Sequence, residues 1–184
     1  MKMAFKDIPT STAYHILHPK PAILVISANR EGKVNGMIAA WVTPLSADPP
    51  LAGVAVAPAR YTHGFIKDSG EFTLNVLDRN YIKQVHFLGT VSGRGKDKLG
   101  ESGLTLRASE KVKAPHVAEA LAVAECKVEK EVETGDHTFF VGRILKAYAK
   151  RDVFDEVYRP EKAKILLHLG GSLYTTIIDE VLRP

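Results

Sequence analysis

The amino-acid sequence predicts an all-β protein whose antiparallel strands form a closed or split β-barrel with a few short helices. Six or more segments are rich in β-branched residues or alternate apolar with polar residues, which is typical of strands. The helical segments are few and short. They do not alternate with the strands, which argues against a Rossmann fold. Antiparallel strands with short helices in their connections are typical of barrels.

The first two strands are expected to form a hairpin. Residues 22–29 (AILVISAN) lead into the turn-prone sequence REGK, and residues 34–42 (VNGMIAAWV) follow it. A proline-rich loop is expected over residues 43–50. Residues 51–57 (LAGVAVA) then form an apolar strand, which Pro58 terminates.

A second hairpin is expected in the C-terminal half of the chain. Residues 121–133 and 137–150 both alternate in polarity, and they flank the turn sequence TGD. Residues 71–77 alternate in the same way, and residues 165–169 (ILLHL) form a last short strand. These segments complete the set of strands from which the barrel is predicted.

Three short helical segments are expected in the connections. Residues 61–70 form a helix with Thr62 as its N-cap. Residues 78–89 form a second helix, with apolar residues on one face and Gly89 at its C-terminal end. Residues 116–120 are expected to form a single helical turn.

The composition indicates one globular domain spanning residues 1–184. The net charge of +4 favours anionic small molecules slightly, and it is too small to indicate nucleic-acid binding. The single cysteine, Cys126, excludes an internal disulfide and is expected to be a small buried side chain. The N-terminus lacks the apolar core of a signal peptide, and no apolar run approaches the length of a membrane span. A cytoplasmic protein without membrane contact is therefore expected.

Several common motifs are absent. Residues 89–98 (GTVSGRGKDK) resemble a phosphate-binding P-loop, but Thr90 stands where its first glycine is required, and Asp97 follows the lysine. Neither GxGxxG nor GxSxG occurs. His15 and His18 lie three residues apart without a carboxylate or thiol at ligand spacing, so no metal site is expected there.

The segment APARYTHGF (57–65) is a candidate anion site. Arg60, Thr62 and His63 cluster at the start of the expected helix, where free N–H groups and the helix dipole favour a phosphate. The alternative is that Thr62 only caps the helix and Arg60 is solvated. The residues alone leave both interpretations open.

Two further segments are candidates for ligand binding. The loop VSGRGKDK (91–98) carries Arg94, Lys96 and Lys98 on a flexible backbone that can wrap an anion, although such loops are more often simply exposed. Trp41, the only tryptophan, lies near the end of a strand that begins at Asn35. It can stack on a ligand ring, or it can serve only in core packing.

His137 is the last candidate. It directly follows the Gly-Asp turn and opens a strand, at a position where the strand gains nothing from an imidazole. A half-exposed histidine at a strand end is one explanation, and a side chain directed at a ligand is the other.

In order and spacing, these segments resemble the flavin reductase-like, FMN-binding split-barrel family, which includes ferric reductases, flavoredoxins and reductase components of two-component monooxygenases. The resemblance covers residues 18–175. It rests on NGMIAAWVTPLSADPPLAGVAVAPARYTHGFIKDSGEFTLNVL (35–77), SGRGKDK (92–98) with SGLT (102–105), and GDHTFFVGRI (135–144). Flavoredoxin-like members are the most similar because of Asn35, Trp41, Lys98 and His137.

The resemblance implies a six-stranded antiparallel Greek-key split barrel. It also implies a homodimer that holds FMN non-covalently near the subunit interface. Residues 35–46 would lie along the flavin ring and the ribityl chain, residues 60–63 at the phosphate, and residues 92–98 in a loop that closes over the cofactor. The implied cofactor-binding residues are Asn35, Trp41, Thr43, Ser46, Arg60, Thr62, His63, Asn75, Ser92, Arg94, Lys98 and His137.

Two of these residues would act in catalysis. A reduced nicotinamide, NADH or NADPH, would pass a hydride to FMN, and Lys98, with Arg94, would favour the reduced flavin electrostatically. His137 would orient the ring or the nicotinamide and donate a proton. The chain departs from the family at Gly95, where many members have an acidic residue, and at Ala40, where many have Ser or Thr. Both departures bear on the choice of nucleotide and acceptor.

Three functions share this expected site. The first is an NAD(P)H-dependent flavin or ferric reductase that passes electrons to a small-molecule or protein acceptor. The second is an electron carrier that uses no nicotinamide, and the third is an FMN-binding protein without turnover. A pyridoxamine phosphate oxidase-like activity and an RNA-binding barrel agree less well with the motifs.

Overall fold

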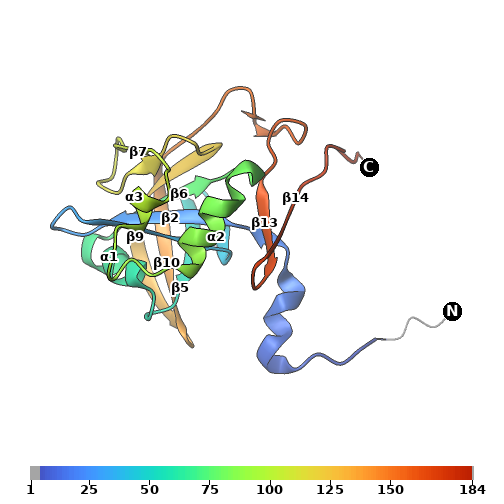
Figure 1. Cartoon of the computed structure of the whole chain (residues 1–184), viewed down its shortest axis with the longest axis horizontal. Helices are drawn as coiled ribbons and strands as arrows, with labels where there is room; N and C mark the ends of the chain where they lie inside the picture. Colours follow the sequence, from blue (N-terminus) through green and yellow to red (C-terminus); the bar gives the residue numbers. More distant parts are fainter. Residues whose placement is uncertain (1–4, 184) are drawn as a thin grey trace.

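The body of the protein is one antiparallel sheet of seven strands in the order β3-β2-β6-β9-β10-β5-β4 (Figure 1). It is seen in a computed structural model that describes residues 5–183. The strands are β2 (Ile23–Ala28), β3 (Val34–Ala39), β4 (Val42–Ala47), β5 (Pro50–Val56), β6 (Glu71–Val76), β9 (Ala122–Thr134) and β10 (His137–Ala149). The two expected hairpins are confirmed as β2–β3 and β9–β10.

The sheet curls because its two edge strands are consecutive in the chain. Only Ala40 and Trp41 separate β3 at one edge from β4 at the other, and the carbonyl of Trp41 accepts from the N–H of Ala55 at 3.0 Å. Residues 34–47 therefore serve as one bent strand that belongs to both edges. The fold is the expected split barrel, with seven strands in place of six because this strand is divided at its bend.

The barrel interior and the outer face of the sheet each carry an apolar core. The interior core draws side chains from β2, β5, β6, β9 and β10, among them Phe72, Cys126 and Phe140, all fully buried. A Cβ on Gly142 would lie 2.5 Å from the Phe72 ring, so this aromatic ring needs the glycine opposite it. The outer core packs Leu24 and other sheet residues against α2.

The helices lie in the connections between strands. They are η1 (Thr10–Leu17), α1 (Tyr61–Ser69), η2 (Arg79–Tyr81), α2 (Ile82–Thr90) and α3 (Lys98–Glu101). The remaining strands are short: β1 (Lys20–Pro21), β13 (Leu166–Gly170) and β14 (Leu173–Thr176) form one small sheet. Two ribbons, β7 (Leu106–Arg107) with β8 (His116–Val117) and β11 (Phe154–Asp155) with β12 (Val157–Tyr158), complete the fold.

Two expectations about strands and loops were wrong. Residues 43–50 contain strand β4 where a loop was expected, because β4 is an edge strand and an edge tolerates Pro44. Residues 116–120 begin with strand β8 in place of a helical turn, and the Asn75 side chain accepts from the N–H of Val117 at 3.0 Å.

Two helix ends also differ from expectation. Thr62 is not the N-cap of α1, because its hydroxyl accepts a hydrogen bond from Asn35 and Arg60 stands at the cap position. Gly89 lies inside α2, which continues to Thr90. The eight-residue helix η1 was not anticipated.

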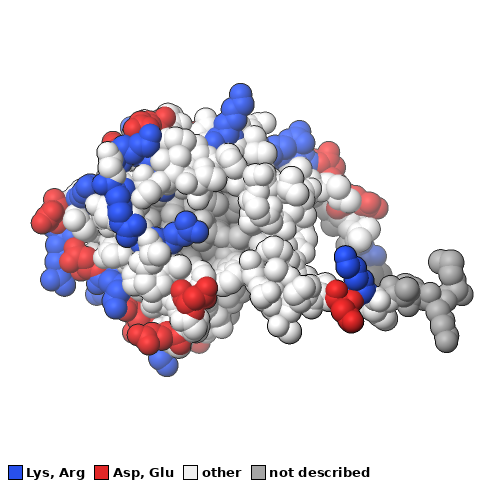
Figure 2. Space-filling view, turned by 60° about the horizontal axis from the view of Figure 1, so that its bottom comes forward, with Lys and Arg blue, Asp and Glu red and all other residues white. Residues whose placement is uncertain are grey.

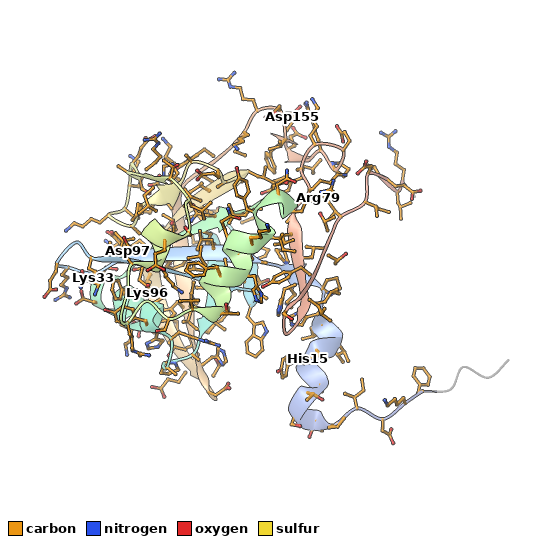
Figure 3. All side chains as sticks on the ribbon, viewed as in Figure 1. His15, Lys33, Arg79, Lys96, Asp97 and Asp155 are labelled. Carbon is orange, nitrogen blue, oxygen red and sulfur yellow. The ribbon has the colours of Figure 1, made fainter. Side chains whose placement is uncertain are left out.

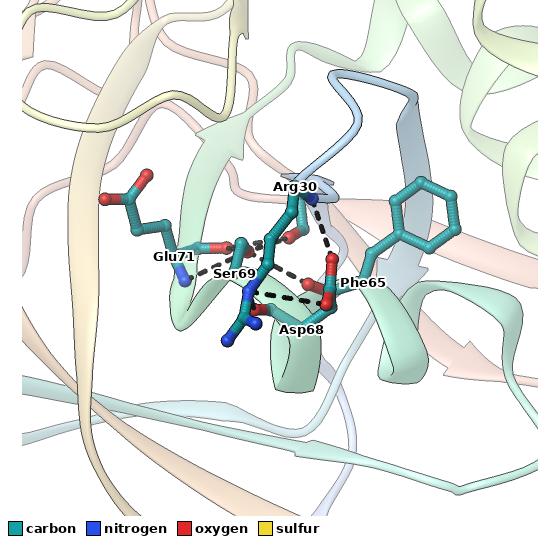
Figure 4. Close-up of polar contacts among 6 residues, drawn as sticks. Arg30, Phe65, Asp68, Ser69 and Glu71 are labelled. Atoms are coloured by element: carbon teal, nitrogen blue, oxygen red, sulfur yellow. Dashed lines mark hydrogen bonds and ion pairs between the residues drawn. The ribbon is translucent and has the colours of Figure 1, made fainter.

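The C-terminal end of α1 is fixed to the sheet by polar contacts (Figure 4). Arg30, in the β2–β3 turn, donates from its backbone N–H to the Asp68 carboxylate at 2.7 Å, and its Nε donates to the Asp68 carbonyl at 2.9 Å. Ser27 of β2 donates to the carbonyl of Glu71 at 2.7 Å. These contacts hold the C-terminal end of α1 against the β2–β3 turn and the start of β6.

The N-terminal segment stands apart from the barrel (Figure 1). None of the eight residues of η1 is buried. The segment that contains η1 and the segment that follows β14 lie on the same side of the molecule as β13. Within residues 5–183, no helix is long and apolar enough to cross a membrane.

Candidate functional site

Two adjoining cavities form one groove beside the barrel. Each has a volume of about 220 Å³, and Met37, Ile38 and Arg60 line both. Figure 2 shows a hollow in this face, with lysine and arginine side chains on one side of it and uncharged side chains on the other. We name the cavity lined by Arg60, Arg94 and Lys98 the basic end, and the one lined by four histidines the imidazole end.

The basic end is built on the N-terminus of α1. Arg60, Tyr61 and Thr62 line it, and the first N–H groups of a helix have no partner within the helix. The Thr62 hydroxyl, which is buried, accepts from the Asn35 amide at 2.7 Å. This contact fixes the helix start against β3. The helix dipole and the Arg60 guanidinium together make this end attractive to an anion.

The loop over residues 91–98 forms the opposite wall of the basic end. Arg94 donates from Nη1 to the carbonyl of Ala59 at 3.0 Å, which ties the loop to the start of α1. Gly93 packs directly on Asn35: a Cβ built on Gly93 would lie 2.1 Å from the Asn35 Oδ1 atom. Only glycine allows this approach, so the loop needs Gly93 to close the groove.

Lys98 is the most constrained cation of the groove. Its side chain is 4% exposed, and its ammonium donates to the carbonyls of Leu88 and Val91, each at 2.8 Å. Burial, together with the nearby charge of Arg60, lowers the pKa of Lys98 to about 8. An ammonium has three N–H donors, so one remains for a ligand. An anion bound beside Lys98 would favour the charged ammonium and would raise its pKa again.

Further cations surround the mouth of the basic end. Lys33 and Arg94 both approach the Tyr61 ring, at 5.5 and 5.6 Å from its centroid. Lys96 is exposed and forms an ion pair with Glu101 at 2.8 Å. Lys33, Lys96 and Asp97 lie on one side of the molecule and His15 on the other (Figure 3). The positive charge is thus concentrated at one end of the groove.

The imidazole end contains the only tryptophan. Trp41 and His137 lie face to face, with ring centroids 4.7 Å apart and planes inclined by 33°. His137 Nδ1 donates to the Asp136 carboxylate at 2.8 Å, which lowers the pKa of Asp136. In the neutral imidazole this leaves Nε2 as the acceptor atom.

The other wall of the imidazole end comes from distant parts of the chain. Tyr14 and His15 of η1, His18, and His168 of β13 line it. Sequence reasoning missed this wall. It noted the spacing of His15 and His18 but tested it only for a metal. Their nearest imidazole neighbour, His168, lies 150 residues from His18, so no local pattern could have revealed it.

The groove brings together eight of the twelve sequence-predicted cofactor residues. They are Asn35, Trp41, Arg60, Thr62, Ser92, Arg94, Lys98 and His137. The other four line neither cavity. Thr43 and Ser46 lie on the edge strand β4.

The remaining two residues, His63 and Asn75, are buried behind the groove. His63 Nε2 lies 2.9 Å from the Thr138 hydroxyl, and desolvation lowers the pKa of His63. Asn75 donates to the Leu24 carbonyl and accepts from Val117, so its amide is satisfied within the core. Contacts of this kind position the strands that carry the groove.

The fold and the groove define a split-barrel protein with an anion-attracting cleft that continues into an aromatic pocket. The chain belongs to the flavin reductase family: residues 16–176 match the model of the flavin reductase like domain. An uncharacterized protein of Archaeoglobus fulgidus is 42% identical over 169 residues, covering 91% of this chain and 94% of that protein. Membership supports a flavin-related oxidoreductase role.

Two solved structures resemble the whole chain. An FMN-binding protein from Thermus thermophilus, crystallised with 1-cyclohex-2-enone, superposes with a TM-score of 0.86 at 31% identity and covers 100% of both chains. Flavoredoxin of Desulfovibrio vulgaris (Miyazaki F) superposes with a TM-score of 0.82 at 25% identity, covering 100% of this chain and 96% of that one.

Proposed function

We propose that this protein is an FMN-dependent oxidoreductase that takes a hydride from NADH or NADPH and passes electrons to an acceptor. One observation carries the proposal: a buried lysine, two arginines and a helix N-terminus converge on a cavity that continues into an aromatic pocket. Among the described residues, no Asp or Glu lines either cavity. The similarity to an FMN-binding protein and to a flavoredoxin supports the same proposed function.

The residues of the groove fit FMN in their donor chemistry. The phosphate would lie at the basic end, held by the α1 N-terminus and Arg60. Asn35, Thr62 and Ser92 offer polar groups for the ribityl chain. Trp41 and His137 offer ring faces for the flavin. In this assignment, His63 and Asn75 act through the strands that they hold in place.

When bound, FMN supplies the capacity to accept a hydride and to hold two electrons. The ammonium of Lys98 and the guanidinium of Arg94 would then stabilise the negative charge of the reduced state, because both are fixed and need no reorganisation. Asp136 fixes the orientation of His137 through Nδ1, so that His137 orients the neighbouring ring and exchanges a proton through Nε2.

The visible spectrum of the purified protein, before and after anaerobic addition of NADH and then NADPH, tests this function. Oxidised-flavin absorbance that bleaches with either nucleotide is the expected result. A protein that contains no flavin and binds none on addition would refute the proposal. The nucleotide that bleaches the flavin at the lower concentration identifies the preferred reductant.

A flavoredoxin-like electron carrier is the second candidate, and the similarity to a flavoredoxin favours it. A carrier would hold FMN in the same groove but would take electrons from a protein partner. It predicts flavin absorbance that persists with both nucleotides and bleaches with dithionite. A non-catalytic FMN-binding protein would bleach with dithionite but would pass no electrons to any acceptor.

The proposal includes a homodimer with FMN near the interface. Apolar side chains on the projecting segments support a second copy as the partner, since Ile16, Leu17 and Leu182 are 66%, 65% and 82% exposed. The edge strand β4 would then bring Thr43 and Ser46 toward the neighbouring subunit. Size-exclusion chromatography with light scattering tests this, and a mass of one chain at micromolar concentration would contradict it.

A further inference from the structure

A third cavity, which we name the outer cavity, adjoins the basic end of the groove. It has a volume of about 700 Å³ and shares four residues with the basic end, which are Asn35, Gly93, Arg94 and Lys98. Its other residues line neither end of the groove, and none of them is assigned to FMN. They are Lys33, Val34, Gly95, Lys96, Asp97, Leu99 and Leu106.

The basic end lies between the outer cavity and the imidazole end. It shares Met37, Ile38 and Arg60 with the imidazole end, whereas the outer cavity shares no residue with that end. In Figure 3, Lys33 and Lys96 accordingly lie on one side of the molecule and His15 on the other. A nicotinamide dinucleotide carries its adenosine at the end opposite the nicotinamide. If the nicotinamide meets the flavin ring at the imidazole end, the outer cavity is placed to receive the adenosine.

Three cations border the outer cavity besides the buried Lys98. The ammonium of Lys33 donates to the Tyr61 hydroxyl at 3.1 Å, and Arg94 is tied to the start of α1. Lys96 pairs with Glu101 at 2.8 Å. This pair is exposed, and exposed ion pairs are weak, so a phosphate can replace Glu101 as the partner of Lys96. Cations from two separate segments thus border one cavity, which suits a phosphate group.

Asp97 is the one acidic residue of the lining in the described part of the chain, and its carboxylate is already engaged. Its Oδ1 accepts from the N–H of Gly100 at 3.0 Å and caps α3. In dinucleotide-binding folds, a carboxylate binds the ribose 2′-hydroxyl of NADH, whereas a basic side chain accommodates the 2′-phosphate of NADPH. The lining of the outer cavity therefore matches the phosphorylated nucleotide.

Apolar side chains complete the lining of the outer cavity. Val34, Leu99 and Leu106 contribute to it, and such surface suits the flat face of an adenine ring. Gly95 also lines the cavity, and a Cβ built on it would meet nothing within 4 Å. The cavity therefore combines an apolar surface, a cluster of cations and open space, as a phosphorylated adenosine requires.

We propose that the outer cavity binds the phosphorylated adenosine of NADPH, and that Lys33, Arg94 and Lys96 bind its 2′-phosphate and so select NADPH over NADH. This inference rests on the proposed function, which requires a reduced nicotinamide nucleotide as the hydride donor. The two nucleotides differ only in this phosphate, which carries a charge of about −1.5 to −2 at pH 7. Because the hydride chemistry is the same for both, the outer cavity changes KM and leaves kcat unaltered.

Binding of 2′,5′-ADP measures the occupancy of the outer cavity without electron transfer. The FMN-loaded protein is titrated calorimetrically with 2′,5′-ADP and with 5′-AMP, which lacks the 2′-phosphate. We expect 2′,5′-ADP to bind about tenfold more tightly, with FMN retained. Equal affinities would overturn the inference. Release of FMN by 2′,5′-ADP would overturn it as well, because the nucleotide would then occupy the basic end.

Lysine variants test which side chains bind the 2′-phosphate. Lys33→Gln and Lys96→Gln should each weaken 2′,5′-ADP binding roughly five- to tenfold and leave 5′-AMP binding unchanged. Both lysines are exposed, so the fold should tolerate either change. Lys130→Gln, at an exposed position of β9 outside the cavity, is the matched control. Unchanged 2′,5′-ADP affinity in both cavity variants would contradict the assignment.

Gly95 allows a test that removes no existing contact. Gly95→Glu places a carboxylate at an open point of the cavity, and Gly95→Gln places a neutral amide of the same size there. Repulsion should make 2′,5′-ADP affinity about tenfold lower in Gly95→Glu than in Gly95→Gln. Equal affinity in these two variants would show that the 2′-phosphate lies elsewhere.

Reduction kinetics separate this inference from the proposed function. KM should be about tenfold lower for NADPH than for NADH, and Lys33→Gln should raise KM for NADPH alone, with kcat unchanged. Flavin that bleaches equally well with both nucleotides would overturn the selection of NADPH and leave the proposed function intact. Flavin that bleaches with neither nucleotide would refute the proposed function, and this inference with it.

Discussion

The two ends of the groove achieve ligand recognition by different physical means. At the basic end, cations are held rigidly: Lys98 is buried and donates to two carbonyls, and Arg94 is tied to Ala59. At the imidazole end, the groups are neutral or titratable, and one wall comes from a helix that buries nothing. A permanent charge suits the phosphate of the proposed cofactor, and aromatic and imidazole faces suit its ring.

Loss of Lys98 is expected to give the largest effect. Lys98→Met removes the buried charge and leaves the carbonyls of Leu88 and Val91 without their donor. FMN affinity should fall roughly 100-fold, since a hydrogen bond to a charged group contributes about 1.5–3 kcal/mol. Isothermal titration calorimetry measures the affinity. Lys96→Met, on the same loop but exposed, is the matched control and should change affinity less than threefold.

The next largest effect on FMN affinity is expected from Gly93, where the loop over residues 91–98 packs on β3. Gly93→Ala places a Cβ 2.1 Å from Asn35 Oδ1, so the loop must move away from the groove. FMN affinity should fall about tenfold, because the loop then no longer closes the basic end. Gly95→Ala, two residues along, meets nothing within 4 Å and serves as the control. Equal affinity in the two variants would show that the loop does not close on FMN.

The pH dependence of FMN binding follows from Lys98. Its pKa of about 8 means that the free protein loses this cation as pH rises through 8, whereas bound FMN that accepts a hydrogen bond from the ammonium raises the pKa by favouring the charged form. FMN affinity should therefore fall by up to about tenfold per pH unit above 8. Titrations from pH 6 to 9.5 measure this slope. A slope that persists in Lys98→Met would assign it to another group.

The smallest effect is expected from the aromatic stack. Trp41→Leu removes the ring that faces His137 at 4.7 Å, and FMN affinity should fall roughly threefold, as expected for one aromatic contact. Phe154→Leu changes an exposed aromatic ring outside the groove and is the control. A fall as large as that of Lys98→Met would mean that the imidazole end contributes as much to cofactor binding as the basic end does.

Most of the barrel could be predicted from the sequence because its signals are local. The turn sequences REGK and TGD stand between strands of alternating or apolar residues, and both hairpins formed as expected. The strand at residues 42–47 was missed because Pro44 and its neighbours indicate a loop when read alone. Whether a proline is tolerated depends on its place at a sheet edge, and that place is set by the folded barrel.

The basic end could be anticipated for the same reason. Its cations lie in two short segments, 57–65 and 91–98, whose glycines and charges are visible in the sequence. The burial of Lys98 was not visible, since it depends on the C-terminal carbonyls of α2. The imidazole end was missed because it assembles His18 and His168 across most of the chain. Residues that only the tertiary structure brings together produce no periodic pattern and no fixed spacing in the sequence.

The position of η1 indicates how the barrel would respond to a protease that cuts at the end of this helix. The helix buries none of its eight residues, and it meets the barrel through a few aromatic and imidazole rings. A single cut after Leu17 would therefore remove little of the free energy that folds the barrel. It would nevertheless take Tyr14 and His15 away from the groove. Such a cut would thus open the imidazole end and leave the lining of the basic end intact.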